Sequence, residues 1–134
     1  AMAVGMDEGL LVPVVHGAEK LGLVDLMLRL KDITERAVGK KLTPADQEGS
    51  TFTISNLGMY GVESFTSIIN QPNSAILSIA GTKEMPVVRN GEVVIRPIMK
   101  MSLTSDHRVI NGLAAAKFMQ ELKATLESPL PLLV

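Results

Sequence analysis

The stretch that decides the fold is Ser102-Leu103-Thr104-Ser105-Asp106-His107-Arg108-Val109-Ile110-Asn111-Gly112. A β-rich run, residues 92–103, leads into it, and a run with apolar residues at helical spacing, residues 112–127, follows it. His107 is therefore predicted to lie on a loop between a strand and a helix, where a polar side chain is exposed on a rigid support. Asn111 stands just before the helix, where its side chain can cap the first turn.

The histidine at position 107 has two possible roles, one catalytic and one structural. A histidine side chain titrates close to neutral pH in its unperturbed state, so it can accept a proton and return it during a reaction. A histidine beside a helix cap can equally be a structural residue, and the local sequence alone favours that interpretation. The second histidine, His16, has no acidic or histidine neighbour in the sequence, and we expect it at the surface.

The composition excludes several classes of function. The chain has 134 residues, enough for one domain with its own core, and a formal net charge of −1. This balance gives no electrostatic basis for binding nucleic acid or an anionic membrane, and an aromatic content of 3% argues against stacking on bases. The absence of cysteine excludes a thiol nucleophile, a disulfide framework and a cysteine-based metal site, and we expect no metal. No apolar run approaches the ~20 residues that span a bilayer, and residues 1–15 do not resemble a signal peptide.

Apolar periodicity predicts an α/β fold in which two helices cover a mixed sheet. The first helix, residues 23–38, is expected to end near Gly39 and to turn Leu23, Met27 and other apolar side chains toward the sheet. The second, residues 112–127, is expected to do the same through Phe118 and its neighbours. The predicted strands cover residues 2–6, 10–15, 51–55, 74–81, 87–89 and 93–101.

Ser55 is predicted to lie where the strand 51–55 gives way to a glycine-bearing loop. The plainest interpretation is a hydroxyl group that bonds its own loop backbone. Gly58 and Gly61 do not form a phosphate-binding motif, because their spacing is wrong and no lysine follows. Nothing in this segment alone assigns a reaction.

Three blocks of the chain together resemble the catalytic domain of the dihydrolipoamide acyltransferases, the E2 components of 2-oxoacid dehydrogenase complexes. The blocks are DEGLLVPVV (residues 7–15), GSTFTISNLGMYG (residues 49–61) and SDHRVING (residues 105–112). Most relatives carry Asp at the position of Asn111, although Asn occurs in some members, and the family domain is nearly twice as long as this chain. The resemblance therefore implies that residues 1–134 are the C-terminal half to two-thirds of a chloramphenicol acetyltransferase-like domain, without the lipoyl and subunit-binding domains.

The resemblance implies an enzyme that moves an acyl group between dihydrolipoamide and coenzyme A. In that scheme His107 is the general base, Ser55 donates a hydrogen bond to the oxyanion, and Asn111 supports the histidine loop. Asn56 and Gly58 are expected to contact coenzyme A, which is a substrate, whereas the lipoyl group is carried on a domain outside this chain. His107 and Ser55 are expected to come from adjacent subunits of a homotrimer.

The resemblance also implies a large assembly. Family homotrimers join into a hollow core, which binds the E1 and E3 components through domains outside this chain. The implied location is the bacterial cytoplasm or the mitochondrial matrix, with the former favoured. The apolar tail, residues 130–134, is expected to anchor one subunit to another, because exposed apolar side chains need a partner; the alternative is that it folds back onto its own sheet.

Two other functions stay open. A core subunit without turnover would have the same fold, and the short chain and Asn111 leave room for it, whereas His107 and Ser55 favour catalysis. A stand-alone small-molecule acetyltransferase of the chloramphenicol type usually carries two adjacent histidines, and Asp106 at the position before His107 counts against it.

Overall fold

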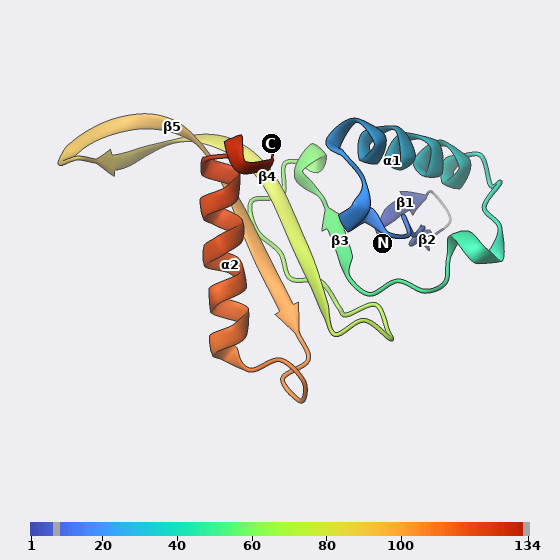
Figure 1. The fold of residues 1–134 in the computed structure, drawn as a ribbon. Coiled ribbons are helices and arrows are strands. Elements are labelled where there is room, and N and C mark those ends of the chain that lie inside the picture. The colour runs from blue at the N-terminus through green and yellow to red at the C-terminus, as the bar shows by residue number, and fades with distance from the viewer. Residues whose placement is uncertain (7–8, 133–134) are drawn as a thin grey trace.

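The computed structural model of the chain describes residues 1–6 and 9–132. Its two small sheets and two long helices are joined by loops that contain short 3₁₀ helices (Figure 1). The strands are β1 (Val4–Met6), β2 (Gly9–Leu11), β3 (Thr53–Asn56), β4 (Ala75–Arg89) and β5 (Glu92–Ser105). The helices are α1 (Leu23–Val38) and α2 (Gly112–Glu127), with 3₁₀ turns η1 (Ala18–Lys20), η2 (Pro44–Asp46), η3 (Gly58–Tyr60) and η4 (Leu130–Leu132).

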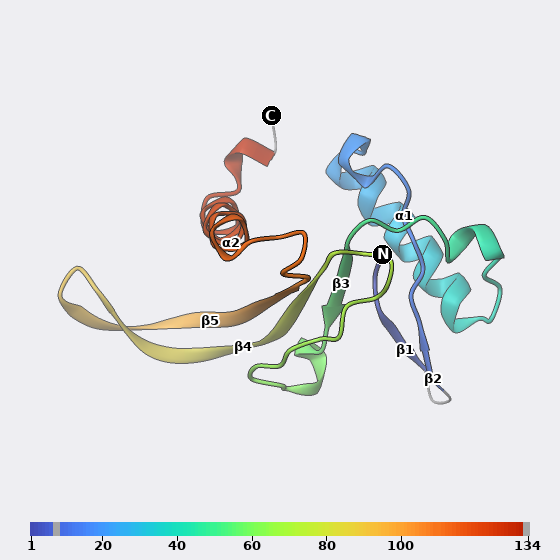
Figure 2. The ribbon, with the colours of Figure 1, turned by 90° about the horizontal axis from the view of Figure 1, so that it is seen from below.

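The larger sheet has the order β3-β4-β5, with β3 parallel and β5 antiparallel to β4. This confirms the predicted mixed sheet and α/β class. The helix α2 lies over one face, where the rings of Phe52 and Phe118 are 5.9 Å apart between centroids (Figure 2). The loop between η3 and β4 lies on the other face, where the Ser67 and Ser78 hydroxyl groups are 2.7 Å apart. The larger sheet thus has an apolar face, which α2 covers, and a hydroxyl-bearing face, on which Ser78 meets Ser67 of the loop.

The smaller sheet is the antiparallel hairpin of β1 and β2. Its N-terminal extension joins it to the larger sheet, because Met2 pairs in parallel with Ile54 at the edge of β3. The second strand ends at Leu11, not near residue 15 as expected. Beyond it the backbone bonds other partners: the Pro13 carbonyl accepts from the Met2 N–H at 3.0 Å, and the Val14 N–H donates to the Asp46 carbonyl at 2.8 Å.

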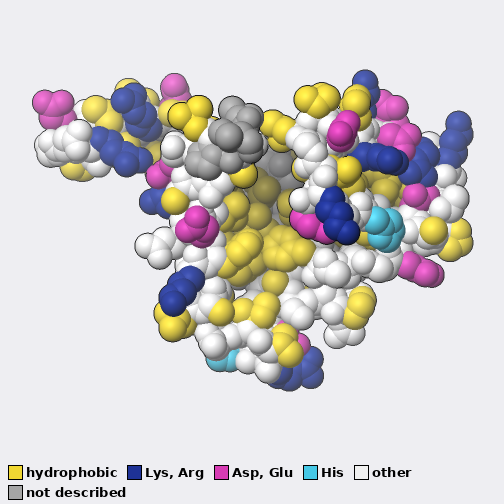
Figure 3. All heavy atoms as spheres, viewed as in Figure 1, with side chains coloured by type: hydrophobic (Ala, Val, Ile, Leu, Met, Phe, Trp, Pro, Cys, Tyr) yellow, Lys and Arg dark blue, Asp and Glu magenta, His cyan; other side chains and the backbone are white. Residues whose placement is uncertain are grey.

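Both long helices have the predicted bounds, but their surroundings differ from the expectation. The helix α1 contacts β1 beside the hairpin, and does not cover the larger sheet together with α2 (Figures 1 and 2). Only Ile33 and Ala37 of α1 are buried, whereas Leu23 and Met27 are 63% and 60% exposed. No residue of α2 is buried. Figure 3 shows a hollow between the two helices with a hydrophobic floor.

Strand β4 is longer than expected, because the break predicted between residues 81 and 87 does not occur, and β5 extends beyond the predicted residues 93–101 at both ends. The pairing continues through an irregularity between Ile79 and Thr82, and the distal halves project as a two-stranded arm (Figure 1). Asn90 and Gly91 close the arm with φ angles of 53° and 84°, the left-handed conformation that a tight hairpin turn requires.

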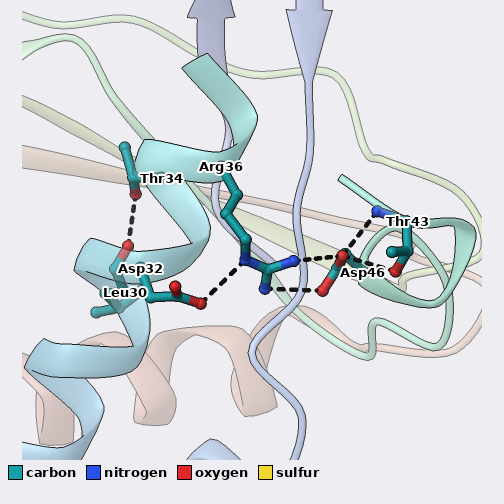
Figure 4. Close-up of polar contacts among 6 residues, drawn as sticks. All are labelled: Leu30, Asp32, Thr34, Arg36, Thr43 and Asp46. Atoms are coloured by element: carbon teal, nitrogen blue, oxygen red, sulfur yellow. Dashed lines mark hydrogen bonds and ion pairs between the residues drawn. The ribbon is translucent and has the colours of Figure 1, made fainter. Parts of the chain in front are cut away.

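Arg36 ties α1 to the connector that precedes β3 (Figure 4). Its guanidinium donates to both carboxylate oxygens of Asp46, at 2.6 and 3.0 Å, and to Asp32 at 3.0 Å. The Thr43 backbone N–H and hydroxyl donate to the same Asp46 carboxylate, so Arg36 and Thr43 together hold the pKa of that carboxyl far below its usual value. Within the described residues, no helix is long and apolar enough to cross a membrane.

Candidate active site

His107 lies on the turn between β5 and α2, as predicted, and its side chain is exposed. The strand side of the turn is fixed by the Asp106 N–H, which donates to the Ser74 carbonyl at 2.8 Å. The helix side is fixed by Asn111, whose Oδ1 accepts from the Ala114 N–H at 2.9 Å. This confirms Asn111 as the cap of α2, and it places His107 between two anchored ends.

Asp106 and Arg108 bracket the histidine and bond each other. The Arg108 guanidinium donates through Nε to Asp106 Oδ1 at 2.9 Å and through Nη2 to Oδ2 at 2.6 Å. The Arg108 backbone N–H also donates to Oδ1, at 3.0 Å. These bonds lower the pKa of Asp106 to about 2, so the carboxylate stays ionised at neutral pH. The sequence interpretation missed this pair, although its Asp-x-Arg spacing was visible.

Ser55 lies one residue inside β3, because the strand continues through Asn56. It is paired with Ser78 of β4, which is paired in turn with Ser102 of β5, so three serine side chains share the hydroxyl-bearing face of the sheet. The Ser55 hydroxyl makes no hydrogen bond within residues 1–6 and 9–132, in contrast to the expected bond with its own loop backbone. Its half-buried hydroxyl is therefore available to a ligand.

Ser55 and His107 do not meet within one chain. Ser55 is two strands away from Ser102, and Ser105 lies three residues farther along β5. With strands ~4.8 Å apart and a rise of ~3.4 Å per residue, the Cα atoms of Ser55 and Ser105 are about 14 Å apart, and His107 lies beyond Ser105. Serine and histidine side chains cannot span that distance, so one chain does not hold both groups against the same substrate atom.

Sequence comparison identifies the family. Residues 1–134 match the family described as 2-oxoacid dehydrogenases acyltransferase (catalytic domain). The chain belongs to this acyltransferase family. It is 37% identical over 134 residues to the dihydrolipoyllysine-residue acetyltransferase component of the pyruvate dehydrogenase complex of Rickettsia prowazekii, covering 100% of this chain and 33% of that protein. It is 43% identical over 133 residues to the succinyltransferase component of the 2-oxoglutarate dehydrogenase complex of Rickettsia bellii, covering 99% of this chain and 33% of that protein.

Solved acyltransferase structures share the fold. The dihydrolipoamide acetyltransferase of Azotobacter vinelandii superposes with a TM-score of 0.94 at 37% identity, covering 99% of this chain and 55% of that one. The cubic core of a pyruvate dehydrogenase multienzyme complex gives a TM-score of 0.94 at 38% identity, with the same shares. The chain thus spans about a third of the length of these curated relatives and about half of the length of the solved acyltransferase chains.

One spacing in the Azotobacter acyltransferase bears on the site. That structure belongs to a study of the catalytic roles of three residues: a serine, a histidine 52 residues later and an asparagine four residues after the histidine. Ser55, His107 and Asn111 have the same spacings in this chain. Asn111 thus has a counterpart at the same spacing in a solved acetyltransferase.

Asn56 and Gly58, expected to contact coenzyme A, make contacts within the chain. The Asn56 Oδ1 accepts from the Gly58 N–H at 2.8 Å and turns the backbone directly after Ser55. A Cβ atom at Gly58 would lie 2.9 Å from the Ala80 carbonyl oxygen, so only glycine fits there. These contacts explain both residue types, and their role toward coenzyme A stays a prediction. Among the described residues, no three His, Cys, Asp or Glu side chains group in a way that could hold a metal ion.

Proposed function

We propose that residues 1–134 form the C-terminal part of an acyltransferase catalytic domain that moves an acyl group between dihydrolipoamide and coenzyme A. The observation that carries the proposal is His107, exposed on a turn that is anchored at both ends, with Ser55 and Asn111 at the spacings found in the Azotobacter acetyltransferase. Transfer between two thiols needs a group that removes and returns a proton near neutral pH, and histidine is suited to that task.

His107 acts as the general base in this proposal. It takes the proton from the attacking thiol, because a free thiol with a pKa of about 8.5 is mostly protonated at neutral pH. The sulfur then bonds to the thioester carbonyl carbon, and the carbonyl electrons move onto oxygen. When the tetrahedral intermediate collapses, the bond to the departing sulfur breaks and His107 gives that sulfur its proton. The chain stays unmodified throughout, so no protein nucleophile is needed.

Ser55 stabilises the tetrahedral intermediate by donating its hydroxyl hydrogen to the oxyanion. Its hydroxyl makes no bond within the described residues, so it can meet a developing charge without first giving up a partner. One such donor supplies about 3–4 kcal/mol of barrier reduction. Asn111 takes no part in proton transfer and acts by capping α2 at the end of the histidine turn.

The site is completed by a second copy of the chain, in a homotrimer. Two observations support this: Ser55 and His107 are too far apart in one chain, and the arm of β4 and β5 leaves apolar side chains uncovered. Ile95, Val88 and Val93 of the arm are 65%, 69% and 73% exposed. Register puts Val88 opposite Val93 and Ile95 opposite Pro86, so all lie on one face of the arm. An isolated two-stranded ribbon is only marginally stable, and a neighbouring copy would cover this face.

The trimers are proposed to join into a larger hollow core, as the cubic core of the structural relative suggests, and to bind E1 and E3 components through other domains. Leu130 and Leu132 are 70% and 59% exposed, so η4 does not bury them against its own sheet, which favours an anchoring role between subunits. Leu133 and Val134 lie outside the described residues. The relatives include bacterial and mitochondrial proteins, and we place this one in the bacterial cytoplasm or the mitochondrial matrix.

The test is turnover of the full-length protein with His107 replaced by alanine. Transfer from acyl-dihydrolipoamide to coenzyme A should fall by about two to four orders of magnitude, the usual contribution of a positioned acid–base group, while particle mass stays the same. Near-normal turnover in His107→Ala would reject the proposal. Absence of turnover in the unmodified full-length protein would instead favour a structural core subunit.

A further inference from the structure

His107 owes its orientation to the backbone of its turn. Its ring makes no hydrogen bond within the part of the chain that the structure describes, and the side chain is exposed. Nothing on the ring itself therefore fixes where its nitrogen atoms point. A catalytic base must be held to within a fraction of an ångström of its productive geometry, and within this chain the restraint comes from the residues on either side.

The restraint converges on Asp106. Its N–H is bonded to Ser74 of the neighbouring strand, and its carbonyl accepts from the N–H groups of Val109 and Ile110, at 3.1 and 2.9 Å. Its carboxylate accepts from the backbone N–H and the guanidinium of Arg108. These bonds thus all end on Asp106, while the Asn111 cap holds the helix end of the turn separately.

The ion pair between the Asp106 and Arg108 side chains contributes little to the stability of the fold. Arg108 is 86% exposed and the Asp106 side chain 25% exposed, and pairs open to water to this degree add little to stability. What the carboxylate does provide is a fixed acceptor for the Arg108 backbone N–H, which sets the backbone immediately after His107. Arg108 in turn keeps that carboxylate in place through its guanidinium.

We propose that Asp106 is a positioning residue for the His107 base, and that Arg108 acts as its clamp and does not bind substrate. The inference rests on the proposed acyl transfer. It assigns Asp106 an effect on the rate of the chemical step, with substrate affinity unchanged, because loosening the turn misplaces the base without removing a substrate contact. A displacement of about 1 Å is enough to lower a rate about a hundredfold.

The experiment measures kcat and KM for coenzyme A and acyl-dihydrolipoamide in full-length Asp106→Ala and Asp106→Asn. Asparagine keeps an oxygen acceptor for the Arg108 N–H, so it should rescue most of the loss. We expect kcat to fall about a hundredfold in Asp106→Ala and about tenfold or less in Asp106→Asn, with both KM values within about twofold of the unmodified protein. Particle mass and melting temperature show whether the variants are folded and assembled.

Asp32→Ala is the matched control. It also removes an aspartate that accepts from an arginine, at 3.0 Å, but on α1 and away from the turn, so its turnover should match that of the unmodified protein. A kcat for Asp106→Ala within threefold of the control would overturn the inference. So would a rise in KM for coenzyme A without loss of kcat in Arg108→Gln, which would assign Arg108 to substrate binding. If His107→Ala is also fully active, the proposed function itself fails; if only Asp106→Ala is active, the inference alone fails.

Discussion

Replacement of Asn111 separates a capping role from a chemical one. Among the residues that the structure describes, this exposed side chain makes one bond, in which Oδ1 accepts from the Ala114 N–H at 2.9 Å. Loss of such a cap costs about 1 kcal/mol, which raises the opening equilibrium of the first helical turn about fivefold. Aspartate caps as well as asparagine does, so Asn111→Asp should restore what Asn111→Ala loses.

The assay combines hydrogen exchange with turnover in the full-length protein. The Ala115 amide, which is bonded to the Asn111 carbonyl at 3.1 Å, should exchange about fivefold faster in Asn111→Ala and at the unmodified rate in Asn111→Asp. Turnover should fall by no more than about fivefold in the alanine variant, because a cap worth about 1 kcal/mol cannot change the rate by more, and it should match that of the unmodified protein in the aspartate variant. Thr43→Ala, which removes a capping side chain far from His107, is the control. If Asn111→Asp turns over as slowly as Asn111→Ala, or more slowly, while its exchange is normal, the amide NH₂ group has a role beyond the cap, and the reasoning is wrong.

Two further predictions concern the oxyanion and the assembly. Ser55→Ala should lower kcat about a hundred- to a thousandfold with little change in KM, because the hydroxyl acts mainly in the transition state; a loss seen only in KM would indicate ground-state binding instead. Ending the full-length chain before Leu132 should release trimers from the larger core in analytical ultracentrifugation, since Leu132 is exposed on its own subunit and needs a neighbour; unchanged large particles would contradict the anchoring role.

The elements that local chemistry specifies were predictable from the sequence. Both long helices have the expected bounds, and the Asn111 cap and the turn that carries His107 are where the pattern placed them. Apolar spacing and a capping residue act within one or two turns, so they can be read without knowing the rest of the fold. The pattern did not reveal what covers each apolar face, which is why Leu23 and Met27 are exposed against expectation.

Features that depend on pairing between distant segments were not predictable. The sequence pattern predicted separate strands over residues 74–81 and 87–89, yet β4 runs through Gly81 and Pro86 because β5 pairs with it along the arm, with Pro86 opposite Ile95. Proline is tolerated in a ribbon that is open to solvent. The bonds from Arg36 to Asp46 likewise join a helix to a loop ten residues away, and no periodicity indicates such a contact.

The site shows the same limit. The family resemblance, and not the local residue pattern, implied the roles of Ser55 and His107 and their origin in adjacent subunits. Strand register showed that the two residues lie apart within one chain, since it places Ser55 level with Ser102 and His107 beyond the end of β5. The Asp106–Arg108 pair was within reach of sequence reasoning, because an aspartate in a turn commonly accepts a hydrogen bond from the backbone N–H two residues later.

Co-assembly of two inactive variants tests the central claim most directly. His107→Ala and Ser55→Ala chains, each full-length and carrying a different affinity tag, are expressed together, and mixed particles are purified through both tags. If each site takes His107 from one copy and Ser55 from its neighbour, random mixing restores both groups in about a quarter of the sites, and turnover should rise to about a quarter of that of the unmodified protein. If both groups served a site within one chain, every site would carry one of the two changes. Turnover no higher than the average of the separate variants would contradict the account.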